Sequence, residues 1–153
     1  MKVSKGQIIQ RKGDVNTKSY RVKSGLLRSY TIDEKGKEHI DMFASKDWII
    51  GDFCEAHVPC ELFIEALEDS ELDVRGKNVE GTVAESTLLF RRLGVLQKRI
   101  SMLMSSSAIE RYNHFSETYP DILQRVPQKM IASYLGITPE ALSSVKSKMV
   151  KGN

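Results

Sequence analysis

The chain contains 153 residues, of which 41% are apolar and 28% are charged. That apolar share is enough for a packed core and excludes a mainly disordered chain. No run approaches the roughly 18 apolar residues of a membrane-spanning helix, and no apolar stretch of a secretion signal follows the first charged residues. The 2 cysteines are too few for a disulfide scaffold. We therefore expect a cytoplasmic protein that has no membrane partner.

Charge is divided unevenly between the two halves of the chain. The net charge is +3, yet residues 1–80 carry 13 Lys and Arg against 15 Asp and Glu, whereas residues 81–153 carry 10 against 5. A basic end on a neutral-to-acidic body is typical of proteins that bind polyanions. Solvated basic faces are also common, so charge alone does not establish a nucleic acid partner.

The first half has the pattern of a β domain. Turn-like glycines occur at Gly6, Gly13, Gly25, Gly36 and Gly51. β-favouring runs occupy residues 7–10, 19–22, 26–32, 39–43 and 62–67. Residues 33–37 are expected to form a hairpin turn, and Glu65 and Glu68 to lie on a solvated edge. Many short strands separated by turns predict a sandwich, barrel or jelly roll.

The second half changes to helical periodicity. We expect one long helix up to residue 104, with an apolar seam at steps of 4 and 3 formed by Leu89, Leu93, Leu96, Ile100 and Leu103. Such a seam needs a partner surface, and two remain open: the chain's own sheet, or the same helix of a second copy. Ser107 and Glu110 then have the spacing of a capping box, which predicts a further helix that ends before Pro120.

The most specific signal is a helix, a tight turn and a second helix near the C-terminus. Pro127 suits a first helical position, Gly136 suits a left-handed helix end, and Thr138 and Pro139 suit the cap and first residue of the next helix. Apolar residues at helical spacing face inward between the two helices, at Ile131, Leu135, Ile137, Leu142 and Val145. This pattern predicts a helix-turn-helix, whose second helix enters the DNA major groove. A helical hairpin used only for packing is the alternative.

Both halves together resemble the Crp/Fnr family of bacterial transcription regulators, over nearly the whole chain. The motifs that carry the resemblance lie at residues 5–9, 12–14, 20–28, 33–38, 63–67, 110–112, 119–120 and 131–140. The resemblance implies an α+β fold: an N-terminal double-stranded β-helix or jelly roll of the cyclic-nucleotide-binding type, a long dimerisation helix and a C-terminal helix-turn-helix domain. The expected boundaries are 1–78, 79–104 and 105–153.

The chain departs from the family pattern where a cyclic nucleotide would bind. Members that bind cyclic nucleotides carry a Gly-Glu pair followed by an Arg that pairs with the phosphate. Here Gly51 is followed by Asp52, and residues 53–66 contain no Arg or Lys, so we expect no cAMP binding. The resemblance still implies a pocket for an unknown small-molecule effector. Its candidate residues are Arg28, Gly51, Asp52, Phe53, Cys54 and Glu61.

The DNA-reading helix departs as well. Relatives with a Leu-Ser-Arg pattern place an Arg, which reads guanine in a bidentate fashion, where this chain has Ser144. Base contacts then fall to Glu140, Ser143 and Ser144, and Glu140 is able to accept from the N4 amino group of cytosine. Lysines position the protein on phosphates without specifying sequence. The full set of DNA-binding candidates is Gln128, Lys129, Thr138, Glu140, Ser143, Ser144, Lys146 and Lys148.

Other constellations are weaker. Cys54, His57 and Cys60 have regular spacing, but no fourth ligand for zinc or iron is evident nearby, and packing cysteines beside a surface histidine explain them. A reversible Cys54–Cys60 disulfide is a further alternative. No clustered histidines, nucleophile elbow or phosphate-binding glycine loop is present. We expect no catalytic site, no metal, no cofactor and no enzyme activity.

These observations predict a DNA-binding transcription regulator that responds to an effector. Its expected partners are double-stranded DNA, a second copy of the chain, the effector and RNA polymerase. The alternative is a ligand-sensing or interaction module of the same fold that has lost specific DNA binding, which the serine at position 144 favours.

Overall fold

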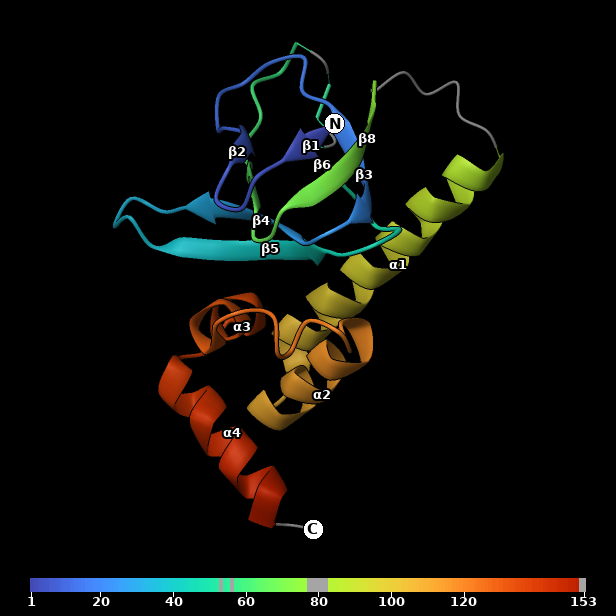
Figure 1. Cartoon of the computed structure of the whole chain (residues 1–153). Helices are drawn as coiled ribbons and strands as arrows, with labels where there is room; N and C mark the ends of the chain where they lie inside the picture. The colour runs from blue at the N-terminus through green and yellow to red at the C-terminus, as the bar shows by residue number, and fades with distance from the viewer. Residues whose placement is uncertain (53, 56, 77–82, 152–153) are drawn as a thin grey trace. The chain divides into compact units, whose positions relative to one another are not determined.

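The computed structural model describes residues 1–52, 54–55, 57–76 and 83–151. The chain divides into two compact units, Met1–Glu80 and Gly81–Asn153, called here the β unit and the helical unit (Figure 1). Within the described residues, neither unit contains a helix of the length and apolarity needed to cross a membrane.

The β unit is built from two antiparallel sheets (Figure 1). The first sheet has the order β1 (Lys2–Val3), β8 (Ser70–Arg75), β3 (Ser19–Ser24) and β6 (Ile49–Gly51). The second has the order β2 (Ile8–Gln10), β7 (Phe63–Ala66), β4 (Leu27–Ile32) and β5 (Glu38–Ala44). The sheet neighbours β1 and β8 come from opposite ends of the unit, as in a roll. The predicted β-roll is confirmed, and β2, β3, β4, β5 and β7 coincide with the expected runs.

The core of the β unit lies between the two sheets. The first sheet contributes Val3, Tyr20, Val22, Ile50 and Leu72, and the second contributes Leu27, Met42, Ala44, Ile64 and Ala66. Strand β8 was not predicted from the sequence, although its acidic and apolar residues alternate as in a half-buried strand and Leu72 at its centre is fully buried. Strands β1 and β6 are too short to show a period of their own.

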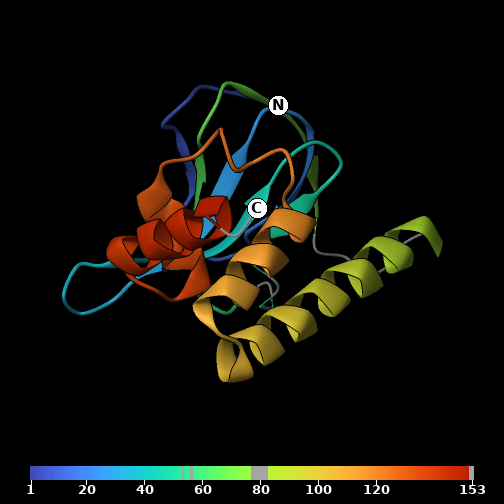
Figure 2. The same ribbon diagram turned by 90° about the horizontal axis from the view of Figure 1, so that it is seen from below.

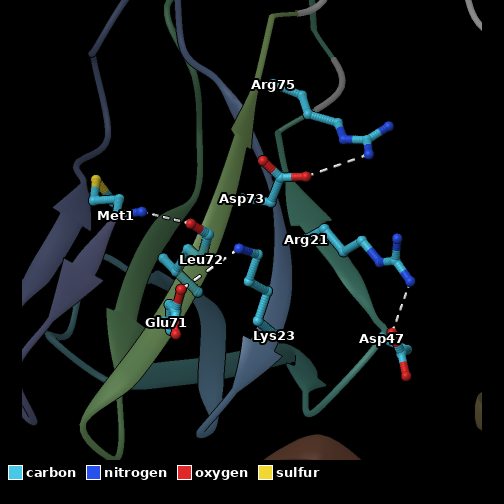
Figure 3. Close-up of polar contacts among 8 residues, drawn as sticks. All are labelled: Met1, Arg21, Lys23, Asp47, Glu71, Leu72, Asp73 and Arg75. Atoms are coloured by element: carbon cyan, nitrogen blue, oxygen red, sulfur yellow. Dashed lines mark hydrogen bonds and ion pairs between the residues drawn. The ribbon is translucent and has the colours of Figure 1, made fainter.

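Several charged side chains on and beside the first sheet form ion pairs. Three ion pairs are formed: Arg21–Asp47 at 2.7 Å, Lys23–Glu71 at 3.5 Å and Arg75–Asp73 at 3.3 Å (Figure 3). The amino group of Met1 donates to the carbonyl oxygen of Leu72 at 2.6 Å. Exposed pairs of this kind contribute little stability. They do balance the positive and negative charges of this surface, so we propose no binding site there.

A buried ion cluster occupies the second sheet. The Arg28 side chain on β4 is only 6% exposed and donates to Glu65 on β7 at 2.9 Å and to Glu38 on β5 at 2.6 Å. Its guanidinium also lies 4.2 Å from the ring centre of Tyr30. Burial lowers the pKa of Arg28, but the hydrogen bonds to Glu38 and Glu65 outweigh burial and raise it. The expected solvated edge at Glu65 is wrong, because β7 lies inside the sheet between β2 and β4.

The helical unit contains α1 (Val83–Ser105), α2 (Ala108–Thr118), α3 (Gln128–Leu135) and α4 (Pro139–Lys151). The predicted capping box is confirmed: Ser107 caps α2, and the Glu110 carboxylate accepts from the backbone N–H of Ser107 at 2.6 Å. In both views α2 lies beside the C-terminal part of α1 (Figures 1 and 2). Rings of Phe115, Tyr119 and Tyr134 pack together at 5.3–5.4 Å between centres and join α2 to α3.

Removing either acid tests how far the buried guanidinium depends on it. Glu65→Ala leaves Arg28 without its better-buried partner, so we expect a loss of about 2–4 kcal/mol in the free energy of unfolding of the β unit. Glu38 is 45% exposed in its side chain, and Glu38→Ala should cost less than about 1 kcal/mol. Urea unfolding, followed by the fluorescence of the single tryptophan, Trp48, which packs against this core, measures both. Equal losses would contradict this account.

Candidate nucleic-acid interface

The turn between α3 and α4 has the geometry that the sequence predicts. Gly136 ends α3 with φ 64° and ψ 32°, in the left-handed region that glycine adopts without strain. Its N–H donates to Ser133 at 3.2 Å, and the N–H of Ile137 donates to Ala132 at 3.1 Å. These two bonds close the end of the helix and direct the chain into α4.

The starts of the two helices differ from each other. At α4, the Thr138 hydroxyl accepts from the N–H of Ala141 at 3.2 Å, and Pro139 is the first helical residue, as expected. At α3, Pro127 precedes the helix instead of forming its first residue. Its ψ of 144° is extended, while its carbonyl already accepts from the N–H of Met130 at 2.9 Å. Pro127 is therefore the cap residue, and the prediction for it was wrong by one position.

The apolar faces of α3 and α4 meet as predicted. The residues at the contact are Ile131, Ala132, Leu135, Leu142 and Val145, all of them buried. Ile137, in the turn, is half-buried. Because these side chains close the space between the helices, the opposite side of α4 is left for solvent or a partner.

Most of the DNA-binding candidates from the sequence are exposed. On α4, Glu140, Ser143, Ser144 and Lys148 are exposed and follow one another at helical spacing, and Lys146 is half-buried. Gln128 and Lys129 are exposed in the first turn of α3, and Thr138 is exposed in the turn. The structure therefore brings the candidate base-reading residues onto one strip of α4.

Hydrogen bonds decide what this strip offers to a ligand. The Ser144 hydroxyl donates to the backbone carbonyl of Glu140 at 3.0 Å, so its hydrogen is used inside the helix. Bonds from the Glu140 backbone N–H and from the Thr138 hydroxyl lower the pKa of Glu140 and keep its carboxylate ionised. Both side chains thus present acceptor oxygens. In the major groove, such acceptors match the amino groups of cytosine and adenine and do not match the acceptors of guanine.

A second exposed feature is an apolar stripe along α1. Leu93, Ile100 and Leu103 of the predicted seam are exposed, Leu96 is half-buried, and the side chain of Leu89 lies outside the described residues. The stripe also contains Phe90 and Met104, which are 73% and 81% exposed. The sequence analysis missed both, because Gln97 interrupts the apolar spacing between them.

The other side of α1 packs within the helical unit. Met102 is buried there, and the Arg99 guanidinium lies 4.2 Å from the ring centre of Tyr134 on α3. An added Cβ at Gly94 would meet nothing within 4 Å, so no close contact inside the chain requires that glycine.

The effector candidates fall into two separate groups. Asp52 holds a loop together, because its carboxylate accepts from the N–H of Cys54 and from the N–H of Glu61, both at 3.0 Å. Glu61 also pairs with Lys12 at 2.7 Å. Gly51 lies in β6 so close to β3 that a Cβ would be 3.2 Å from the Lys18 carbonyl oxygen. Arg28 makes its ion pairs elsewhere, and Phe53 lies outside the described residues.

An open hollow of about 510 Å³ lies along a different loop. It is lined by residues between Ile9 and Tyr20, including Asp14 and Lys18, and by none of the effector candidates. Cys60 is buried and its thiol donates to the carbonyl oxygen of Arg11 at 3.0 Å. Burial, followed by the nearby Asp52 charge, raises the pKa of Cys60. Among the described residues, no cluster of His, Cys, Asp and Glu has the arrangement of a metal site.

Comparisons with known proteins give relatives along the whole chain, although no protein-family model matches it. Regulatory protein HlyX of Actinobacillus pleuropneumoniae is 28% identical over 97% of this chain and 70% of its own length. The fumarate and nitrate reduction regulatory protein of Yersinia pestis is 26% identical over 99% of this chain and 68% of its own. The chain thus spans about two thirds of the length of these relatives.

Solved structures show the same fold at lower identity. FixK2 from Bradyrhizobium japonicum matches with a TM-score of 0.80 and 20% identity, over 99% of this chain and 84% of its own. A transcriptional regulator of the CRP/FNR family from Thermus thermophilus matches with a TM-score of 0.83 and 17% identity, over 100% and 86%. The predicted α+β class, a β-roll followed by a helical domain, is confirmed.

Gly136 offers a test of the turn. Gly136→Ala places a side chain in the left-handed region and 3.3 Å from Leu103, so we expect the helical unit to lose about 1–2 kcal/mol in its free energy of unfolding. Gly94→Ala, inside α1 and in open space, is the matched control and should gain about 0.5–1 kcal/mol. Chemical unfolding followed by far-ultraviolet circular dichroism measures both. A neutral Gly136→Ala would show that the turn tolerates another geometry.

Proposed function

We propose that the chain is a homodimeric transcription regulator of the Crp/Fnr family that binds double-stranded DNA through α4, because its relatives are named regulatory proteins and its fold matches that of CRP/FNR regulators. Its relatives carry the names of regulators, in agreement with the expectation that the chain is not an enzyme. The observation that carries the proposal is the α3–α4 pair, closed inside by apolar side chains and capped at Gly136, with a polar strip facing outward.

Sequence reading falls to three side chains on this strip. Glu140, Ser143 and Ser144 face outward on the first turns of α4, the part of a recognition helix that contacts base edges. Acceptor oxygens at Glu140 and Ser144 favour sites rich in cytosine and adenine amino groups over sites read through guanine. Lys129, Lys146 and Lys148 contact phosphates, with Gln128 and Thr138 beside them, and these contacts supply most of the affinity.

Dimerisation takes place through the apolar stripe of α1. Phe90, Leu93, Ile100 and Met104 are exposed on the side that the helical unit does not cover, and a contiguous apolar patch of this kind marks an interface. Leu96 and Leu103 of the predicted seam lie beside them, and the sequence alone adds Leu89. A dimer places two copies of α4 on one face of DNA, where half-sites lie about 34 Å apart.

The β unit is the sensor, and an effector bound in it shifts the population between two dimer arrangements. Arg28 is already neutralised by Glu38 and Glu65, which supports the expectation that the unit does not bind cAMP. The loop held by Asp52, with Gly51, Cys54 and Glu61, is the proposed place for the effector, and Phe53 is a further candidate from the sequence alone. RNA polymerase in the cytoplasm is the further partner of a bound regulator.

One observation favours a second candidate function. Ser144 uses its hydroxyl hydrogen on the Glu140 carbonyl, so the helix has no donor where relatives with the Leu-Ser-Arg pattern have an arginine. An interaction module that no longer reads DNA is consistent with that change. The two candidates predict opposite results in a DNA-binding titration.

Two lysines test the DNA interface directly. In Lys129→Ala/Lys146→Ala, each dimer loses four proposed phosphate contacts, so the slope of log affinity against log salt should fall by about 4. Fluorescence anisotropy with random-sequence duplex DNA at several salt concentrations measures this slope. Lys12→Ala/Lys23→Ala removes the same charge from the β unit and is the control, with an unchanged slope. Folded wild-type protein that fails to bind at low salt, with a metabolite extract present as well, would support the interaction module.

The stripe on α1 is tested by a single charge. Ile100 is 58% exposed, and Ile100→Glu buries a carboxylate if two stripes pack together, so we expect mainly monomer at micromolar concentration. Lys98→Glu changes an exposed residue of the same helix away from the stripe and should leave the dimer intact. Sedimentation velocity distinguishes the two masses. A wild-type monomer, or a dimeric Ile100→Glu, would refute the proposed interface.

A further inference from the structure

The side chain of Arg111 links the ends of two helices. Arg111 lies in the first turn of α2, and all three of its guanidinium nitrogens donate to backbone carbonyl oxygens. Nη2 reaches Leu103, in the last turn of α1, at 3.1 Å, and Nε reaches Ser106, the residue that follows α1, at 3.0 Å. Nη1 reaches Leu135, the last residue of α3, at 3.0 Å.

These acceptors are the groups that most need a cation. The last carbonyls of a helix have no partner within the helix and carry the negative end of its dipole. A guanidinium is planar and presents several N–H donors in fixed directions, so one side chain satisfies carbonyls of both helices at once. An ammonium is a compact charge that moves freely and does not define the angle between two helices.

Two further contacts hold the end of α1 against α3 and the α3–α4 turn. The Cβ position of Gly136 is 3.3 Å from the Leu103 side chain and 3.5 Å from Nη1 of Arg111, so the turn of the helix-turn-helix lies against the end of α1. Arg99 of α1 forms a second link, because its guanidinium lies over the Tyr134 ring and donates to the Tyr134 carbonyl at 3.4 Å. The links between α1 and α3 described here run through long side chains.

We propose that Arg111 is a positioning residue, whose guanidinium fixes the direction of α3 and α4 relative to α1. The consequence of this inference rests on the proposed function. In a dimer joined along α1, the direction of α4 relative to α1 sets the separation of the two recognition helices. Arg111 contacts no DNA and acts only through the ends of α1 and α3.

A distance measurement within one chain tests the joint without DNA. Nitroxide labels are placed at Lys98→Cys in α1 and Ser147→Cys in α4, both exposed, with Cys54→Ser and Cys60→Ala and an excess of unlabelled protein. Pulsed dipolar spectroscopy then reports the distribution of the α1–α4 distance. We expect Arg111→Gln and Arg111→Lys to broaden it about twofold, since neither side chain spans three carbonyls. Arg125→Gln, which removes an ion pair with Asp121 in the segment between α2 and α3, is the control and should leave it unchanged.

The outcomes separate this inference from the proposed function. An unchanged distribution in Arg111→Gln overturns the inference, and so does loss of helix content in both Arg111 variants, because Arg111 would then maintain folding and not direction. If wild-type protein binds no DNA, the label distances still decide the role of Arg111. If it does bind, Arg111→Gln should lose about tenfold in affinity for a selected two-half-site operator and less than about twofold for random DNA.

Discussion

The arrangement of the helical unit depends on how the ends of two helices are satisfied. The final carbonyls of α1 and of α3 share one cation, the guanidinium of Arg111, because a helix has no partners of its own for them. Gly136 forms the left-handed end of α3, and because it has no side chain, the Leu103 side chain of α1 can lie close to this turn. The place of α4, and of each side chain proposed to contact DNA, follows from these contacts.

In the β unit, the charge of the buried Arg28 is already balanced by two carboxylates. Arg28 lies among Glu38, Glu65 and Tyr30 in the second sheet, so an anionic effector would have to displace a carboxylate to reach it. A neutral or apolar effector meets no such cost. Both the lack of Arg and Lys in residues 53–66 and these ion pairs support the proposal that the unit does not bind a phosphate ligand.

Local signals and long-range contacts differed in how well the sequence predicted them. The capping box at Ser107, the left-handed Gly136 and the cap at Thr138 were predicted because each depends on a few adjacent residues. The predicted place of Pro127 at the start of α3 was wrong by one position, because the fixed φ of proline suits both the cap residue and the first helical residue. Glu65 was misplaced, because its partner Arg28 is 37 residues away.

Sequence alone determined the order of the elements, the β-roll followed by helices, and the residues on the outer strip of α4. Its apolar periodicity and turn chemistry act within a few residues and are visible in the chain. Tertiary structure decided that Phe90 and Met104 belong to the exposed stripe. It also decided that the Ser144 hydroxyl donates to the Glu140 carbonyl and that Arg111 links α1 to α3. Those facts depend on which surfaces neighbouring elements cover and which distant carbonyls lie within reach, and neither is encoded in local spacing.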